Sequence, residues 1–243
     1  MWINDQIYIF MNEEKLLSII IPIFNEEKTL LKVLENVQKL KNTVPSIEVI
    51  AINDGSTDNS LKILNENNHL YDLLINNSLN KGKGSAARDG LEVAIGRYIT
   101  FQDADLEYDP NDLIKFLKVI EKFEPDLIIG SRFKYSDYTR SHLFINRMGN
   151  FLITLLFNLF YQTTFTDIYS CYICFKNRLF DHKQLKTDGF EQQAEMLCKI
   201  VKNGKIFFEV PINYNGRSHE DGKKIKFYHI FYVIYQIIIG RFK

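Results

Sequence analysis

Apolar positions along this chain fall into two alternating patterns, short continuous runs and sets with helical spacing. The runs are rich in isoleucine, valine and aromatic residues, which favours β-strands; they occupy residues 16–23, 47–52, 71–75, 98–101 and 126–129. Between them, apolar side chains recur every three or four residues, as at Leu30, Leu34 and Val37, and further helices are expected near 61–64, over 84–95 and after Pro110. This alternation predicts an α/β fold with a doubly wound, mostly parallel sheet flanked by helices.

Polar side chains follow three of the expected strands. Asn25, Asp54 and Asp103 each come directly after an apolar run, and Asp105 lies two residues beyond Asp103. Because ligands of such sheets bind at the carboxyl ends of the strands, these groups are expected at one edge. Two neighbouring carboxylates supply the hard oxygen ligands that Mg²⁺ or Mn²⁺ prefers, and the metal keeps open positions for phosphate oxygens. The pattern therefore predicts a metal-assisted site for a nucleotide diphosphate.

Several short motifs, in order, carry a family resemblance. The stretches SIIIPIFNEE, INDGSTD, NKGKG, FQDADLE and IIGSRF resemble the nucleotide-sugar half of a family 2 glycosyltransferase with the GT-A fold. The later stretches FTDIYSCYICFK, FEQQAEM, EVPINY and NGRSHEDGKKI are similar to the branch that includes dolichyl-phosphate mannose synthase and bacterial polyprenyl-phosphate glycosyltransferases. The resemblance covers residues 16–225. It departs at Asn53-Asp54, where many relatives have two acidic residues, and this leaves the preference for UDP or GDP open.

The resemblance implies which residues bind the nucleotide-sugar, the metal and the acceptor phosphate. The nucleotide-sugar would be bound by Pro22, Phe24, Asn25, Glu26, Asp54, Lys83 and Asp103. The metal ligands would be Asp103 and Asp105, with Glu107 as a possible third. The acceptor phosphate would be bound by Arg132, Arg147 and Arg217, whose planar guanidinium groups match phosphate oxygens.

The need for a catalytic base depends on the acceptor. A lipid monophosphate, with its second pKa near 6, is already ionised and needs no proton removed. A sugar hydroxyl would need a positioned carboxylate, for which Asp167 and Glu195 are the candidates. The expected reaction is a metal-dependent, inverting transfer from a nucleotide-diphosphate sugar to a polyprenyl phosphate. Two alternatives stay open, a saccharide hydroxyl acceptor in polysaccharide or glycan assembly, and a non-catalytic nucleotide-sugar-binding partner of a membrane protein.

A competing interpretation concerns the glycines. The spacing Gly82-x-Gly84-x-x-Ala87 imitates a dinucleotide-binding fingerprint, with Asp103 about 20 residues further on. That motif needs its first glycine directly at the end of a strand, and here residues 76–81 intervene. The spacing is therefore not expected to bind a dinucleotide.

Composition bounds the remaining possibilities. A length of 243 residues suits one catalytic domain, and 30 basic residues balance 30 acidic ones, so no nucleic-acid partner is expected. The N-terminal residues lack the pattern of a signal peptide, and three cysteines suggest a reducing, cytoplasmic compartment. Cys171 and Cys174 lie in a strand-like run over 168–175, where an odd separation points them to opposite faces and predicts core residues.

The second half of the chain carries two strongly apolar stretches. Residues 143–161 have polar side chains at Asn146, Asn150, Thr154 and Asn158, which form one stripe on a helix. Residues 227–239 follow three lysines and are too few to span a bilayer, which takes about 20 residues. The expected organisation is a glycosyltransferase domain over 1–225, with a donor half at 16–132 and an acceptor half at 133–225. An amphipathic helix over 226–243 would lie at the cytoplasmic face of a membrane, or beside a separate membrane protein. Core packing or a dimer contact is the alternative for each helix.

Overall fold

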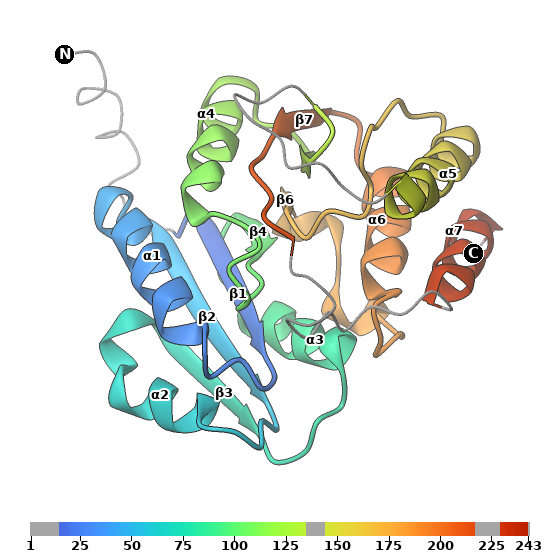
Figure 1. Ribbon diagram of the computed structural model, residues 1–243. Coiled ribbons are helices and arrows are strands. Elements are labelled where there is room, and N and C mark those ends of the chain that lie inside the picture. Colours follow the sequence, from blue (N-terminus) through green and yellow to red (C-terminus); the bar gives the residue numbers. More distant parts are fainter. Residues whose placement is uncertain (1–14, 135–143, 217–228, 243) are drawn as a thin grey trace.

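The computed structural model describes residues 15–134, 144–216 and 229–242, which fold around one seven-stranded sheet (Figure 1). The strand order is β3-β2-β1-β4-β6-β5-β7. The strands are β1 (Leu17–Ile23), β2 (Ile47–Asp54), β3 (Leu73–Asn77), β4 (Tyr98–Phe101), β5 (Leu127–Ser131), β6 (Ile173–Lys176) and β7 (Phe207–Pro211).

Helices connect and cover these strands. The α-helices are α1 (Leu30–Thr43), α2 (Ser60–Glu66), α3 (Lys83–Val93), α4 (Leu113–Phe123), α5 (Phe144–Tyr161), α6 (Gln192–Asn203) and α7 (His229–Phe242). Short 3-10 helices are η2 (Asn68–Leu70), η3 (Pro110–Asp112), η4 (Asn177–Leu179) and η5 (His182–Gln184). In Figure 1, α5 and α7 lie side by side at the right of the molecule, far from α1 and α2.

The central strands have the composition of a sheet covered on both faces. All eight residues of β2 are buried, as are six of the seven in β1, which explains their continuous apolar runs. Right-handed crossovers place α1 and α2 on one face as the chain moves from β1 to β3. The return from β3 to β4 then carries α3 across to the other face, where it packs on β1 and β2. The expected α/β fold is confirmed as a mixed sheet flanked by helices.

One strand from the second half of the chain enters the middle of the sheet. Strand β6 pairs antiparallel with both β4 and β5, with Thr100 opposite Cys174 and Ile129 opposite Ile173. Because β6 reverses direction between them, β5 runs parallel to β4. The carboxyl ends of β1, β2, β4 and β5 therefore meet at one edge of the sheet, which is where the polar clusters were expected.

One expected element differs from the structure in its extent. The run over 168–175 forms a strand only from Ile173 to Lys176, so Cys171 precedes β6. The prediction that Cys171 and Cys174 point to opposite faces of one strand is therefore wrong. Both cysteines are nevertheless buried free thiols, as core residues should be. The helix expected over 143–161 is present as α5. Within the described residues, no helix is both long and apolar enough to cross a membrane.

Candidate active site

The loop after β1 is tied to the loop after β2 through Asn25. Its Oδ1 accepts a hydrogen bond from the backbone N–H of Thr57 at 2.8 Å, and its own backbone N–H donates to Ser56 Oγ at 3.1 Å. The backbone of Asn25 has φ of +54°, a left-handed conformation that asparagine tolerates better than most residues. Glu26 and Thr29 extend the same contact region, since Glu26 Oε2 accepts from Thr29 Oγ1, which lies 2.7 Å from the carbonyl oxygen of Ala104. Thr29 therefore holds the start of α1 against the acidic loop, residues 103–107 after β4.

Asp54, at the end of β2, holds the glycine-containing loop in place. Its carboxylate accepts from the backbone N–H groups of Lys81 at 3.1 Å and Gly82 at 2.9 Å, and from Asn80 Nδ2 at 2.9 Å. Asp54 is 3% exposed. Its oxygens therefore shape the turn that leads into α3. Gly82 takes φ of +100° there, a conformation that favours glycine.

Lys83, the first residue of α3, forms an ion pair with the acidic loop. Its Nζ lies 2.5 Å from Asp103 Oδ1, and both side chains are largely buried. Burial alone would lower the pKa of Lys83, but the negative charge of Asp103 outweighs it and raises that pKa above its ordinary value. A cation therefore already lies against Asp103, and the carboxylates of Asp103 and Asp105 are the hard donors that fit Mg²⁺ or Mn²⁺.

The turn after β4 is held in a strained conformation. Asp105 Oδ1 accepts from the backbone N–H of Glu107 at 3.0 Å, and Leu106 between them has φ of +63°. Glu107 Oε2 accepts from Tyr214 Oη at 2.7 Å, and its carbonyl oxygen accepts from the backbone N–H of Asn215 at 2.9 Å. Glu107 therefore fastens the acidic loop to the segment after β7. No cluster of three metal-binding side chains is assembled in the described part of the chain.

Arg132, at the end of β5, is held by a fully buried carboxylate. Its Nε and Nη2 donate to the two oxygens of Asp167 at 2.7 and 2.9 Å, and its Nη2 also donates to the carbonyl oxygen of Tyr169 at 3.0 Å. Asn150 Nδ2 donates to Asp167 Oδ1 at 2.8 Å. Burial alone would raise the pKa of Asp167, but the charge of Arg132 and these hydrogen bonds hold that pKa below its ordinary value.

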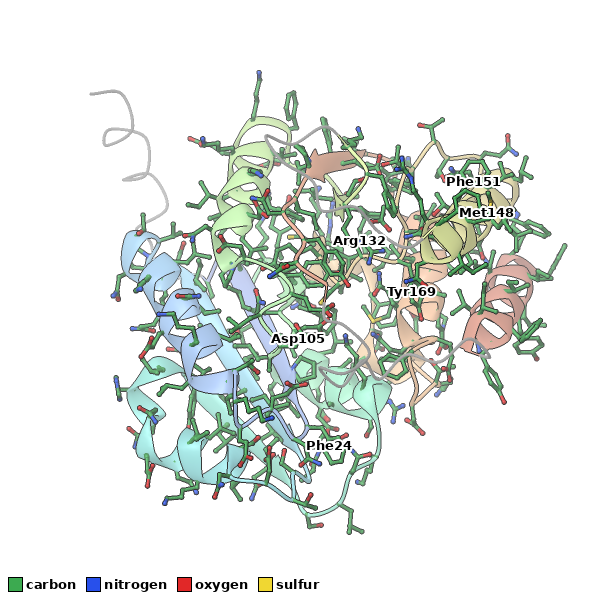
Figure 2. The ribbon with its side chains drawn as sticks, viewed as in Figure 1. Phe24, Asp105, Arg132, Met148, Phe151 and Tyr169 are labelled. Atoms are coloured by element: carbon green, nitrogen blue, oxygen red, sulfur yellow. The ribbon has the colours of Figure 1, made fainter. Side chains whose placement is uncertain are left out.

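Tyr214 contacts both Arg132 and Glu107. The Arg132 guanidinium lies 5.1 Å from the centroid of its ring, while its hydroxyl donates to Glu107. In Figure 2, the labelled side chains of Phe24, Asp105, Tyr169 and Arg132 follow one another across the middle of the molecule. The structure thus connects the acidic loop after β4 with the arginine after β5.

The remaining expected site residues lie in three settings. Pro22 and Phe24, half-buried, lie at the end of β1. Arg147 is exposed on α5, with its guanidinium 5.7 Å from the ring centroid of Phe133. Arg217 lies outside the described residues.

Glu195 is a buried residue of α6 that fixes a neighbouring loop. It forms an ion pair with Lys199 at 2.6 Å and accepts from the backbone N–H groups of Lys186 and Thr187 at 3.0 and 2.9 Å. Burial alone would raise the pKa of Glu195, but these partners hold it below its ordinary value. The loop that it fixes continues to Asp188, whose carbonyl oxygen accepts from the N–H of Gly84 at 2.8 Å. Glu195 therefore supports the start of α3.

Sequence reasoning did not single out Tyr214, nor give Asn150 a role at the site. Tyr214 lies in the EVPINY motif, but its ring contact with Arg132 depends on β7 pairing beside β5. Asn150 belongs to a polar stripe on an otherwise apolar helix, and that unusual stripe is the signal in the sequence that could have found it.

Comparison with known proteins identifies the family. The family described as Glycosyl transferase family 2 matches residues 18–186. The chain is 35% identical over 212 residues to an uncharacterized protein of Methanocaldococcus jannaschii, with 82% of this chain and 89% of that one covered. It is 29% identical over 254 residues to the UDP-N-acetylglucosamine–dolichyl-phosphate N-acetylglucosaminyltransferase of Methanococcus voltae, with 94% and 98% covered.

Solved structures agree on the fold. A glucosyl-3-phosphoglycerate synthase from Mycobacterium tuberculosis, crystallised with Mn²⁺, UDP and phosphoglyceric acid, matches with a TM-score of 0.69 at 16% identity. The match covers 93% of this chain and 78% of that one, and it shows the GT-A fold alone. The chain belongs to family 2 of the glycosyltransferases, and it is an enzyme of that family with the GT-A fold.

Proposed function

We propose that this enzyme transfers a sugar from a nucleotide-diphosphate sugar to a polyprenyl phosphate, with inversion at the anomeric carbon and with Mg²⁺ or Mn²⁺ bound. The observation that carries the proposal is that Tyr214 contacts both the acidic loop and Arg132. Its hydroxyl donates to Glu107, and its ring lies against the Arg132 guanidinium. This arrangement offers one place for a diphosphate held by a metal and, beside it, a cation for a second phosphate. The relative that covers 94% of this chain is named for transfer to dolichyl phosphate, which supports the same acceptor class.

The donor would lie along the ends of β1, β2 and β4. Pro22, Phe24, Asn25 and Glu26 line the first of these ends and would hold the nucleoside. Asp54 would accept a hydrogen bond from the base. It would also shape the loop before α3, so that Lys83 reaches the phosphates.

Asp103 and Asp105 would hold the metal, with phosphate oxygens and water completing its coordination. The metal, when bound, would neutralise charge on the departing nucleotide diphosphate. Lys83 then has to share Asp103 with the metal or move to the phosphates, since its ammonium lies against that carboxylate. We assign Glu107 a positioning role, because its carboxylate already binds Tyr214.

The acceptor phosphate would bind at Arg132, with Arg147 and Arg217 as further cationic contacts. Within the described residues, Nη1 of Arg132 makes no hydrogen bond, while Nε and Nη2 are fixed by Asp167. The guanidinium is therefore held rigidly while one of its nitrogens is left for a ligand. In the transfer, an acceptor phosphate oxygen attacks the anomeric carbon, the bond to the donor diphosphate breaks, and its electron pair leaves with the nucleoside diphosphate.

No carboxylate needs to act as a base in this reaction. The acceptor phosphate is already ionised at neutral pH, and Asp167 and Glu195 are both engaged in several bonds. We therefore propose that Asp167 positions Arg132 and that Glu195 positions the loop beside α3. A polyprenyl acceptor is anchored in a bilayer by its tail, so the reaction would take place at a membrane surface, which we place on the cytoplasmic side where nucleotide-sugars are made.

The test is a matrix of donors and acceptors. Purified enzyme with Mn²⁺ or Mg²⁺ is offered UDP- and GDP-sugars, with and without a short polyprenyl phosphate, and released nucleotide and glycolipid are measured. Glycolipid from one donor supports the proposal. Nucleotide release that depends on an added oligosaccharide, with no glycolipid formed, would contradict it and favour a saccharide acceptor.

A pair of arginine variants sharpens the assignment of the acceptor site. Arg147→Gln should raise the KM for the lipid phosphate without changing the KM for the donor. Arg178→Gln, an exposed arginine on η4, is the matched control and should change neither. Equal effects of the two variants would remove Arg147 from the acceptor site.

A further inference from the structure

Helix α5 carries most of its large apolar side chains on the outside of the molecule, although Ile153, Phe157 and Tyr161 are buried. Seven of its large apolar side chains are exposed, and Phe151 and Leu159 are 59% and 62% exposed. The others are Phe144, Ile145, Met148, Leu152 and Leu155. In Figure 2, Met148 and Phe151 lie on α5 at the outer edge of the molecule, away from the sheet. A helix on the surface of a water-soluble protein normally has the opposite arrangement, so this face is suited to an apolar environment.

Three members of the polar stripe of α5, Asn150, Thr154 and Asn158, instead face the protein. Asn150 Nδ2 donates to the buried Asp167, Thr154 Oγ1 donates to Asn150 Oδ1 at 2.9 Å, and Asn158 Nδ2 donates to the carbonyl oxygen of Phe165 at 2.8 Å. These bonds fix the rotation of α5 about its own axis. The apolar face therefore cannot turn inward without leaving Asp167 short of a partner.

Helix α7 extends the same exposed surface. It packs against α5 and α6 through the buried Val233 and Ile237, and the carbonyl oxygen of Ile237 accepts from Tyr161 Oη at 3.1 Å. Its exposed large apolar side chains are Phe231, Tyr232, Tyr235, Ile238 and Phe242. Among the described residues, twelve of the twenty exposed large apolar side chains lie on these two helices.

The charge of this surface points to its occupant. Neither α5 nor α7 contains an acidic residue, while Arg147 and Arg241 lie on them and both are exposed. Exposed aliphatic and aromatic side chains flanked by arginines complement an anionic lipid surface. Two copies of this face would bring like charges together, which disfavours self-association.

We propose that the face formed by α5 and α7 docks on an anionic lipid bilayer, and that Asn150 links this docking to the acceptor site. This inference rests on the proposed function, since it identifies how a lipid phosphate would be presented to Arg132. The exposed side of α5 lies on the bilayer, while its inner side reaches Asp167 through Asn150, and Asp167 orients Arg132. Asn150 is a positioning residue that acts through Asp167, and it does not itself contact the substrate.

The docking surface is tested by sedimentation with vesicles of phosphatidylcholine and phosphatidylglycerol. The wild-type protein should sediment with these vesicles and far less with phosphatidylcholine alone. The double variant Phe151→Gln/Leu155→Gln should bind about tenfold more weakly, because two apolar side chains no longer enter the interface. Ile95→Gln, which changes a 66% exposed side chain between α3 and β4, is the matched control and should bind like the wild type.

Three results would overturn the surface assignment. They are a wild-type protein that stays in solution, a double variant that sediments like the wild type, and a wild-type dimer in gel filtration that the same double variant dissociates. The last result would assign the face to a second copy of the chain. Vesicle binding does not depend on turnover, so binding without glycolipid formation would refute the proposed function and leave the surface intact.

The role of Asn150 is tested by kinetics with the lipid acceptor. Asn150→Ala should raise the KM for polyprenyl phosphate about tenfold, as expected when one hydrogen bond to a charged group is lost. Its KM for the nucleotide-sugar should stay unchanged. Asn146→Ala, one turn earlier on α5 and exposed, is the control and should leave both constants unchanged. Equal loss of donor and acceptor affinity in Asn150→Ala would show a merely structural role and refute the link.

Discussion

Removal of the Asp167 carboxylate should destabilise the enzyme strongly. Asp167 is fully buried and accepts two side-chain bonds from Arg132, one from Asn150, and backbone bonds from Arg132 at 3.1 Å and Tyr169 at 3.3 Å. Asp167→Ala leaves the largely buried guanidinium without its counter-charge. Breaking a buried pair in this way costs about 3–5 kcal/mol. For a chain of this size each kcal/mol lowers the melting temperature by about 2–4 °C, so a fall of roughly 10 °C is expected.

A double variant separates stability from function at this pair. Arg132→Met/Asp167→Leu removes both charges, and replacing a buried pair with apolar side chains is often nearly neutral for stability. Thermal unfolding should show that the double variant regains roughly half or more of the stability lost in Asp167→Ala. Transfer to polyprenyl phosphate should nevertheless fall strongly, since the Arg132 guanidinium is gone and only Arg147 and Arg217 are left to bind the acceptor phosphate. A melting temperature for Asp167→Ala within about 2 °C of the wild type, or a double variant less stable than the single one, would refute the reasoning.

Four further predictions concern other parts of the structure. Asp105→Ala should abolish turnover and metal-dependent nucleotide binding, measured by calorimetry, with the melting temperature nearly unchanged; full activity would remove the metal assignment. Gly84→Ala should cost about 2–3 kcal/mol, because its Cβ would press on a facing backbone carbonyl oxygen. Gly149→Ala in α5 should instead add about 0.5–1 kcal/mol in urea unfolding, because its Cβ would meet only Ile230 Cδ1 at 3.9 Å, an ordinary van der Waals contact. Leu106→Gly should be about 1 kcal/mol more stable than Leu106→Ala, since only glycine relieves the positive φ. Glu195→Gln should be less stable than the wild type at neutral pH, and the difference should close as pH falls below about 4.5, because a lowered pKa gives stability that is lost when the carboxylate is protonated.

Much of the candidate donor site could be predicted from the sequence, because its arrangement depends on the order of residues close in the chain. The apolar runs that became β1, β2 and β4 were each followed by their polar cluster, and parallel strands bring such clusters to one edge. Asp103 and Asp105 therefore lie at the strand end where the spacing placed them. The roles of individual carboxylates were less accessible. Asp54 and Glu195 were predicted to act on ligands, and the structure adds that each carboxylate fixes a loop whose backbone N–H groups donate to it.

The sequence by itself determined the alternation of strands and helices, the position of the acidic pair and the amphipathic nature of α5. Only the tertiary structure decided which face of α5 points outward, that β6 runs between β4 and β5, and that Asp167 holds Arg132. The physical reason is the range of the interactions. Periodicity and strand ends are set by residues close in the chain, while the partner of a buried charge is chosen by packing. Arg132 and Asp167 are 35 residues apart, and Asn150 reaches Asp167 only because α5 packs with its polar side inward.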